Sequence, residues 1–310
     1  MTDKTSLDCV AVAVSPVSVG FMVLGQRLEQ AVVESGVRPV GRVRLLGAEE
    51  RWAAVEVDVS VPTARLAEVR ASLESAFEGE ADLALIPSAG RRKRLLISDM
   101  DSTIIQQECL DELAAFAGLK NEIAAITARA MAGELDFEAA LTERVGMLAG
   151  LPVSTIEQCY QEKISLMPGA KTLTATIKAN GADCVLVSGG FTSFTSRVAD
   201  AAGFTAHRGI TRIKDGEPLT GEVTRPILGR EAKLRALDEF AEAAGFSRSD
   251  VLAMGDGAND LAMIEAAGLG LAVHAKPIVA SASDAAISVT DLTTALYFQG
   301  YSDSEIVWSE

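Results

Sequence analysis

The sequence is poor in the residues on which nucleic-acid and membrane binding depend. Aromatic residues make up only 5% of the 310 residues, too few for the stacking platforms that bind single strands. The chain has 28 Lys and Arg against 43 Asp and Glu, a formal net charge of −15, whereas a phosphate backbone is bound mainly by basic residues. No apolar run reaches the roughly 18–20 residues that span a membrane. We therefore expect neither a nucleic-acid nor a membrane partner.

Cysteine is also scarce. The four cysteines lie far apart and form no CxxC pair, and three of them sit in apolar runs, which is typical of small core side chains in a reducing compartment. The first fourteen residues lack the charged-then-apolar pattern of a signal peptide. These features predict a cytoplasmic protein.

Residues 1–88 predict a small α+β domain. Their patterns alternate between the strand period and the helix period in the order βαββαβ, which is that of a ferredoxin-like fold. This order resembles an ACT-like regulatory domain, and a role in dimerisation is an equal interpretation. The elements are expected at residues 8–14, 20–35, 38–46, 51–59, 63–77 and 82–86.

A linker and a change of pattern follow. Pro, Ser and Gly at 87–90 mark a boundary, and the basic run at 91–94 is typical of a solvated boundary segment. From Leu95, short apolar runs alternate with helical stretches, which predicts a doubly wound parallel sheet over residues 89–310, a Rossmann-like α/β fold. Residues 106–165 hold only helical patterns, so we expect a helical cap inserted after the first strand.

Acidic side chains follow two of the predicted strands. Asp99 and Asp101 come directly after the strand at 95–98, and Asp256 and Asp260 follow another in the turn GDGAND. Ligands of open α/β sheets bind at these strand ends, and carboxylates so close together are best tolerated beside a divalent cation. An acidic turn or helix cap explains each motif taken alone.

Two further features are weak singly. Ser188 and Gly189 open an SGG turn after a strand, where backbone N–H groups can approach an anion. Lys233 lies early in a predicted helix, where a lone lysine is typical of a solvated face. Taken in order, the motifs DxDST, SGG, Lys and GDGAND resemble those of the haloacid dehalogenase-like phosphatases over residues 95–298.

The resemblance is nearest to the phosphoserine phosphatases of that superfamily. It is carried by the stretches DMDSTIIQQECLDELA, MAGELDFEAALTERV, LVSGGFTSFT, KDGEPLTGEV and GDGANDLAMI. It implies that Asp99 is the nucleophile that forms an aspartyl-phosphate, and that Asp101 is the general acid and then the base. It also implies a Mg²⁺ ion held by Asp99, the Asp101 carbonyl and Asp256, with Asp260 in support.

The resemblance further implies which residues hold the substrate. Those for the phosphoryl group are Ser188, Gly189, Lys233 and Asn259. Those for the rest of the molecule lie in the cap, and they are Glu108, Met131, Phe137 and Arg144. A glutamate suits the ammonium of phosphoserine and an arginine its carboxylate, while the two apolar side chains would exclude water. Each of the four alone is typical of a helix surface or core.

The expected function is Mg²⁺-dependent hydrolysis of O-phospho-L-serine to L-serine and phosphate, the final step of serine biosynthesis. Other phosphatase chemistries lack their residues: no Cys has an Arg six positions later, Gly-Lys never occurs, and only two His are present. Two alternatives stay open. One is a phosphatase or phosphotransferase for another small phosphomonoester, and the other is an amino-acid sensor with vestigial catalysis. A homodimer through the N-terminal domain is also possible.

Overall fold

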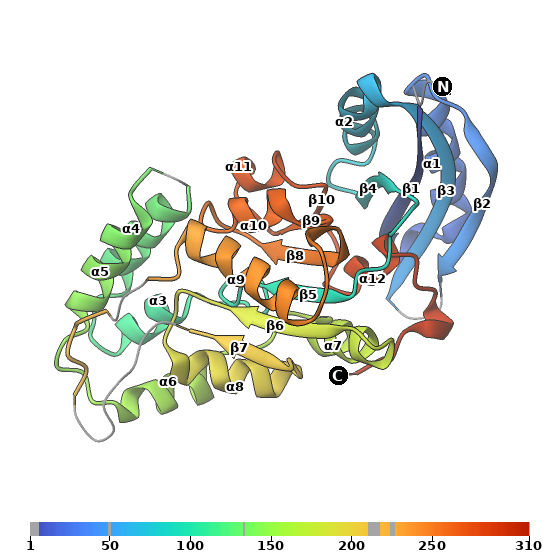
Figure 1. Ribbon diagram of the computed structural model, residues 1–310. Coiled ribbons are helices and arrows are strands. Elements are labelled where there is room, and N and C mark those ends of the chain that lie inside the picture. Colours follow the sequence, from blue (N-terminus) through green and yellow to red (C-terminus); the bar gives the residue numbers. More distant parts are fainter. Residues whose placement is uncertain (1–5, 49–50, 133, 210–217, 224–226, 310) are drawn as a thin grey trace.

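A single ten-stranded sheet runs through the protein. The computed structural model describes residues 6–48, 51–132, 134–209, 218–223 and 227–309. The strands are arranged in the order β2-β3-β1-β4-β10-β9-β8-β5-β6-β7 (Figure 1). The first four in this order are antiparallel and belong to the N-terminal part of the chain, and the last six are parallel. None of the helices in the described part of the chain is long and apolar enough to cross a membrane.

The N-terminal part has strands and helices in the order βαββαβ. Apolar residues alternate between the faces of β1, so that one face contributes Cys9, Ala11 and Ala13 to a core beneath the helices. The opposite face, including Val10 and Val12, belongs to the core of the rest of the protein. The elements are β1 (Ser6–Pro16), α1 (Phe21–Glu34), β2 (Pro39–Gly47), β3 (Trp52–Pro62), α2 (Leu66–Ala76) and β4 (Asp82–Pro87).

The parallel strands are short, and those with continuous apolar runs are almost wholly buried. They are β5 (Leu95–Ser98), β6 (Asp183–Val187), β7 (Ala206–Arg208), β8 (Val251–Gly255), β9 (Leu269–Val273) and β10 (Ala285–Ile287). The sequence pattern did not predict β7, because its three residues, Ala-His-Arg, carry no apolar run. It forms the edge of the sheet beside β6.

Helices cover both faces of this parallel part (Figure 1). One layer contains α7 and α8, which contact β6, and the other contains α9, α10 and α11, of which α10 contacts β8 and β9. The short helix α12 packs against α7 and β1. The helices are α7 (Ala170–Ala179), α8 (Thr192–Ala202), α9 (Arg230–Ala243), α10 (Leu261–Ala266), α11 (Pro277–Ala280) and α12 (Thr294–Phe298).

Four helices between β5 and α7 form a group at the end of the molecule remote from the N-terminal part (Figure 1). They are α3 (Cys109–Ala115), α4 (Lys120–Met131), α5 (Phe137–Met147) and α6 (Ser154–Lys163). The two chain segments that connect this group to the sheet run side by side, since Ile105 and Leu166 form an antiparallel bridge and Met167 N donates to Ile104 O at 2.8 Å.

The N-terminal strands join the parallel sheet through β4. Ala84 of β4 pairs antiparallel with Ala285 of β10. Asp82, which is 2% exposed, accepts hydrogen bonds from the main-chain N–H groups of Ser288 and Thr290 at 2.7 and 2.9 Å. A buried carboxylate needs such donors to offset its lost hydration, so Asp82 ties the two parts of the sheet together.

Candidate active site

Asp99 and Asp101 lie at the carboxyl end of β5, where the chain leaves the sheet. The turn is tight, because the N–H groups of Ile104 and Ile105 both donate to Met100 O. Cys109 N and Ser188 Oγ donate to the Asp101 carboxylate at 2.8 and 3.1 Å. Burial and then the charge of Asp99 raise the pKa of Asp101 to about 6, which brings this carboxyl group nearer to the range in which proton transfer at neutral pH is efficient.

Lys233 lies in the first turn of α9 and is completely buried. Its Nζ atom is 2.5 Å from Asp99 Oδ1 and 2.6 Å from Asp260 Oδ1. Burial opposes the charge of the ammonium group, but the two carboxylates outweigh it and raise the pKa of Lys233. Lys233 is therefore a fixed positive charge at the site and not a residue of a solvated helix face.

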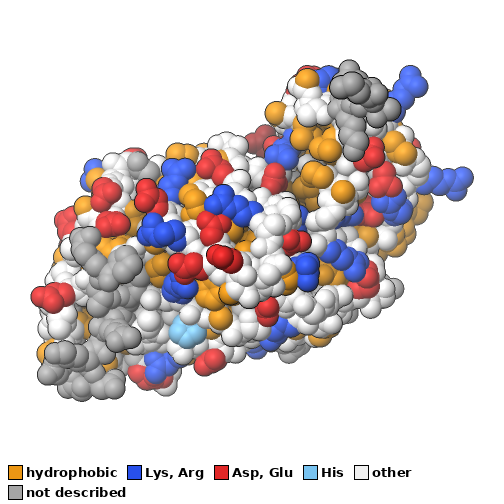
Figure 2. Space-filling view, in the orientation of Figure 1, with side chains coloured by type: hydrophobic (Ala, Val, Ile, Leu, Met, Phe, Trp, Pro, Cys, Tyr) orange, Lys and Arg blue, Asp and Glu red, His pale blue; other side chains and the backbone are white. Residues whose placement is uncertain are grey.

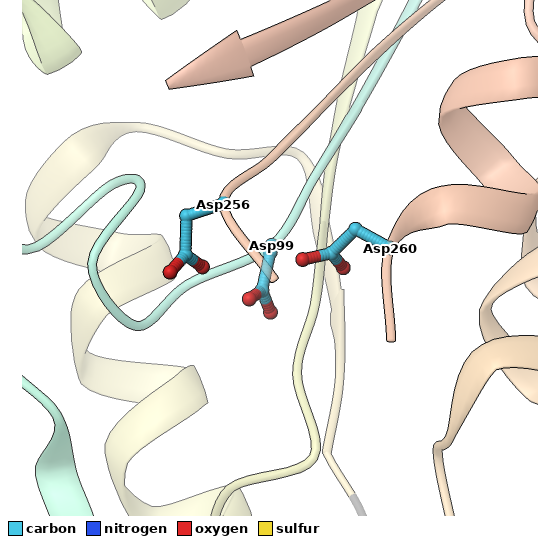
Figure 3. A group of neighbouring side chains, drawn as sticks. All are labelled: Asp99, Asp256 and Asp260. Carbon is cyan, nitrogen blue, oxygen red and sulfur yellow. The ribbon is translucent and has the colours of Figure 1, made fainter. Parts of the chain in front are cut away.

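Three carboxylates converge at the carboxyl ends of neighbouring strands (Figure 3). Oxygen atoms of Asp99, Asp256 and Asp260 all lie within 4.8 Å of one another. Asp256 Oδ1 is buried and has no hydrogen-bond partner among the described residues. Burial raises the pKa of Asp256, followed by the charges of Glu108 and Asp260, and burial followed by Asp99 raises that of Asp260 to about 7. A hard divalent cation prefers oxygen ligands, and a buried carboxylate oxygen without a hydrogen-bond donor is available to bind one.

The SGG turn joins the sheet to α8 beneath the helical group. Gly190 N donates to Ser188 Oγ at 2.9 Å. A Cβ atom on Gly189 would lie only 3.2 Å from Cζ of Phe137, the first residue of α5. The glycine therefore allows the aromatic ring of the helical group to rest directly on the turn.

Two charged side chains of the helical group face the same region. Ser102 Oγ donates to Glu108 Oε1 at 2.6 Å, and burial followed by the charge of Asp101 raises the pKa of Glu108 to about 8. Arg144 on α5 is 2% exposed. Burial lowers the pKa of Arg144, and the charge of Glu108 opposes that change.

Most of the predicted site residues line one small cavity of about 30 Å³. Its lining residues are Asp99, Asp101, Glu108, Leu110, Phe137, Leu141, Arg144, Ser188, Gly189, Gly190 and Asn259. The side chain of Met131 lies outside the described part of the structure. The cavity has room for about one water molecule, which is less than a phosphate ester occupies.

Three residues of this cavity were not predicted from the sequence. Gly190 belongs to the SGG motif and had a signal there, whereas Leu110 and Leu141 look like ordinary core positions of amphipathic helices. A much larger cavity, about 810 Å³, is lined by Arg51, Pro168 and Trp308 among others, and it contains none of the predicted residues. The chemistry-bearing residues thus line the small cavity and not this larger one.

Comparison with known proteins agrees with this arrangement. Residues 96–265, which run from β5 to α10, match the family of haloacid dehalogenase-like hydrolases. The chain belongs to this family. As a haloacid dehalogenase-like hydrolase it carries the family's α/β fold with a parallel sheet, and members of the family generally use a divalent metal.

The hydrolase is similar to several phosphoserine phosphatases. It is 45% identical to the phosphoserine phosphatase of Streptomyces coelicolor over 228 residues, which are 73% of this chain and 55% of that one. It is 42% identical to a probable phosphoserine phosphatase of Schizosaccharomyces pombe, over 69% of this chain and 72% of that protein. The chain spans a little over half the length of the Streptomyces protein and 62% of a Mycobacterium tuberculosis relative.

Solved structures show the same likeness. A substrate-bound phosphoserine phosphatase, 34% identical, superposes on the hydrolase with a TM-score of 0.64 and covers 67% of this chain and 98% of its own. A haloacid dehalogenase family hydrolase from Salmonella enterica serovar Typhi, 27% identical, superposes with a TM-score of 0.78 over 94% of this chain and 98% of its own. The second likeness therefore extends over the N-terminal strands.

Proposed function

We propose that this hydrolase cleaves O-phospho-L-serine to L-serine and phosphate in a Mg²⁺-dependent reaction, the final step of serine biosynthesis. The single observation that carries the proposal is that the carboxyl group of Glu108 and the guanidinium group of Arg144 line the same small cavity as Asp99 and Asp101. Phosphoserine has an ammonium group and a carboxylate beside its phosphate, so it needs one acid and one base there. The names of the similar proteins support the same substrate.

In the proposed mechanism, an Asp99 carboxylate oxygen attacks phosphorus while the bond from phosphorus to the serine oxygen breaks. Asp101 gives its proton to the leaving serine oxygen and then takes a proton from the water that attacks the aspartyl-phosphate. That attack breaks the bond between phosphorus and Asp99 and releases phosphate. The pKa of about 6 and the two hydrogen bonds to Asp101 support its role in proton transfer.

The surrounding residues stabilise charge during these steps. Asp99, the Asp101 carbonyl and Asp256, with Asp260 in support, would hold a Mg²⁺ ion, which would supply neutralising charge and orient the phosphoryl group. We propose that the phosphoryl oxygens are bound by Ser188, Gly189, Lys233 and Asn259. The buried charge of Lys233 beside Asp99 supports this assignment, because positioning and electrostatic stabilisation dominate phosphoryl transfer.

Residues 106–165 are proposed to act as a cap that selects the substrate. Glu108 would bind the ammonium group and Arg144 the carboxylate, while Phe137 and Met131 would exclude water from the bound ester. The contact of Phe137 with the SGG turn and the paired connection at Ile105 support a cap that opens and closes over the site.

Residues 1–88 are proposed to form an ACT-like domain with a regulatory or dimerisation role, on a protein that works in the cytoplasm. The strand order β2-β3-β1-β4 with two helices supports the ferredoxin-like fold. Exposed apolar side chains on this part support a homodimer, and they are Phe21, Met22, Val23, Val33, Val40 and Leu45.

On the face shown in Figure 2, basic side chains are scattered among acidic ones. Calorimetric titration of the full chain with L-serine tests the regulatory role.

The decisive experiment is phosphate release from O-phospho-L-serine with Mg²⁺ and with EDTA, beside O-phosphothreonine and a panel of sugar phosphates. We expect Mg²⁺-dependent release that is fastest with phosphoserine. Release from the other esters alone would keep the Asp99 chemistry and remove the assigned roles of Glu108 and Arg144. No release from any ester would overturn the proposal and favour a sensor.

The role of Arg144 has its own test. Arg144→Ala should lower kcat/KM for phosphoserine far more than for O-phosphoethanolamine, which has the phosphate and the ammonium group but no carboxylate. Equal losses with both esters would remove Arg144 from carboxylate recognition.

A further inference from the structure

Arg144 is held on the side away from the sheet by a chain of hydrogen bonds that crosses three helices. Its Nη1 atom donates to Thr127 Oγ1 of α4 at 2.8 Å. Thr127 Oγ1 in turn donates to Asp111 Oδ1 of α3 at 2.6 Å. All three side chains are at least nine-tenths buried. Buried polar groups in such a chain are strongly constrained, because each partner loses a hydrogen bond if another is removed.

The direction of these hydrogen bonds follows from the single proton of the threonine hydroxyl. That proton can go to Asp111 Oδ1 or to Ile123 O, which lies at 3.0 Å. A carboxylate is the stronger acceptor, and its contact is the shorter one. With the proton directed at Asp111, the oxygen lone pairs of Thr127 face the guanidinium of Arg144. By accepting the hydroxyl proton, Asp111 therefore leaves Thr127 Oγ1 free to accept a hydrogen bond from Arg144.

The remaining hydrogen bonds divide the guanidinium into two sides. Nε donates to Ala140 O at 3.3 Å, so Nε and Nη1 are both used within the helical group. Nη2 has no hydrogen bond to any residue in the described ranges, and Arg144 lines the 30 Å³ cavity. Nη2 is thus the nitrogen that can donate to a ligand, and it belongs to a side chain whose other nitrogens already fix its orientation. An arginine fixed in this way loses little conformational entropy when it binds an anion.

We propose that Thr127 and Asp111 are positioning residues that hold the Arg144 guanidinium for the substrate carboxylate, and so determine the preference for phosphomonoesters that carry a carboxylate. The inference rests on the proposed function. Neither residue lines the cavity, so each acts on the substrate only through Arg144. Both lie among helical residues whose spacing is that of ordinary core positions.

The test compares two esters in four variants, one of which is a control. O-phosphoserine and O-phosphoethanolamine share the phosphate and the ammonium group and differ in the carboxylate. Thr127→Val removes the hydroxyl and keeps the shape of the side chain. We expect it to raise KM for phosphoserine about tenfold, the size of a lost hydrogen bond to a charged group, with kcat nearly unchanged and the kinetics of phosphoethanolamine unaltered. Thr127→Ser restores the hydroxyl and should return KM close to the wild-type value.

Asp111→Asn tests the second link of the chain. It keeps the shape of the side chain but removes the charge that orders the Thr127 proton, so it should raise KM for phosphoserine in the same direction as Thr127→Val. Thr142→Val is the matched control, since Thr142 is an exposed threonine of α5 whose hydroxyl donates, among the described residues, to Glu138 O at 2.7 Å. This control should leave both substrates unaffected.

The outcomes separate this inference from the proposed function. If the wild-type protein releases no phosphate from phosphoserine, the proposed function fails and this inference with it. If the wild type is active and Thr127→Val has wild-type KM for phosphoserine, only the positioning role is overturned. If Thr127→Val slows both esters by the same factor, Thr127 is a structural residue of the helical group, and the inference is again overturned.

Discussion

Lys233 Nζ lies 2.5 Å from Asp99 Oδ1, and both groups are almost completely buried. The same ammonium group lies 2.6 Å from Asp260 Oδ1, so one cation forms ion pairs with two carboxylates that otherwise repel each other. This pairing holds the carboxylate of the proposed nucleophile in place in a buried site. It also makes Lys233 the residue on which the charge balance of the site most depends.

Lys233→Met should therefore reduce both stability and activity. Removing one partner of a buried ion pair costs about 3–5 kcal/mol, because an uncompensated charge is left behind. We expect a loss of this size in the free energy of unfolding from urea denaturation at pH 8 and a smaller loss at pH 6, where Asp260, with its pKa of about 7, takes up a proton. A loss that is equal at both pH values would show that the carboxylates do not depend on Lys233.

Asp99→Asn should abolish turnover and leave the fold intact. The amide has nearly the same shape but cannot form the aspartyl-phosphate, so kcat for phosphoserine should fall by at least about a thousandfold. Circular dichroism and the thermal midpoint serve as controls for folding. Activity within tenfold of wild type would refute the role of Asp99 as nucleophile.

Ser102→Ala should weaken recognition of the ammonium group. Ser102 has a φ of +54°, an uncommon conformation for a residue other than glycine, and its hydroxyl bonds to Glu108. Burial and the charge of Asp101 raise the pKa of Glu108, and this hydrogen bond opposes them by lowering it. Its loss should move the acidic limb of the kcat/KM profile for phosphoserine to higher pH.

The control for Ser102→Ala is an ester with a carboxylate and no ammonium group, such as phospholactate. Its kinetics should change little in this variant, which is the reverse of the selectivity expected for Thr127→Val. If both esters respond alike, Ser102 acts on the loop as a whole and not on Glu108.

Mg²⁺ should raise the thermal midpoint, and more so at pH 8 than at pH 6. The pKa values of Asp101 and Asp260, about 6 and about 7, lie above the ordinary value of 3.8. Protonation of these groups thus stabilises the metal-free fold, fully below about pH 4, and this contribution is lost as the pH rises through 6–7. A bound cation offsets the repulsion that then remains.

The size of the Mg²⁺ effect follows from mass action. At a concentration one hundred times the dissociation constant, Mg²⁺ adds about 2.7 kcal/mol to the free energy of unfolding. Scanning calorimetry of the full chain with Mg²⁺ and with EDTA measures it, and Na⁺ at equal ionic strength is the control. The prediction fails if the shift is larger at pH 6 than at pH 8.

The sequence by itself determined the buried strands and the motifs at their ends, but not the edge strand β7. Continuous apolar runs such as that at β5 belong to strands buried on both faces, and acidic residues that follow them, such as Asp99, must lie at the carboxyl edge of a parallel sheet. The order of strands and helices in the N-terminal part likewise follows from local periodicity. These features depend on neighbours within a few residues, so the linear pattern carries them.

Only the tertiary structure decided how distant residues meet. It buried Lys233 between two carboxylates, paired β4 with β10 through Ala84, and brought Asp111 and Thr127 from separate helices behind Arg144. None of these contacts has a local signal, because a lysine or threonine in a helix has the same sequence pattern whether it faces water or a buried charge. The packing of whole elements sets which side chains lose their hydration. A charged side chain that has lost its hydration is stable only beside groups that pair with it.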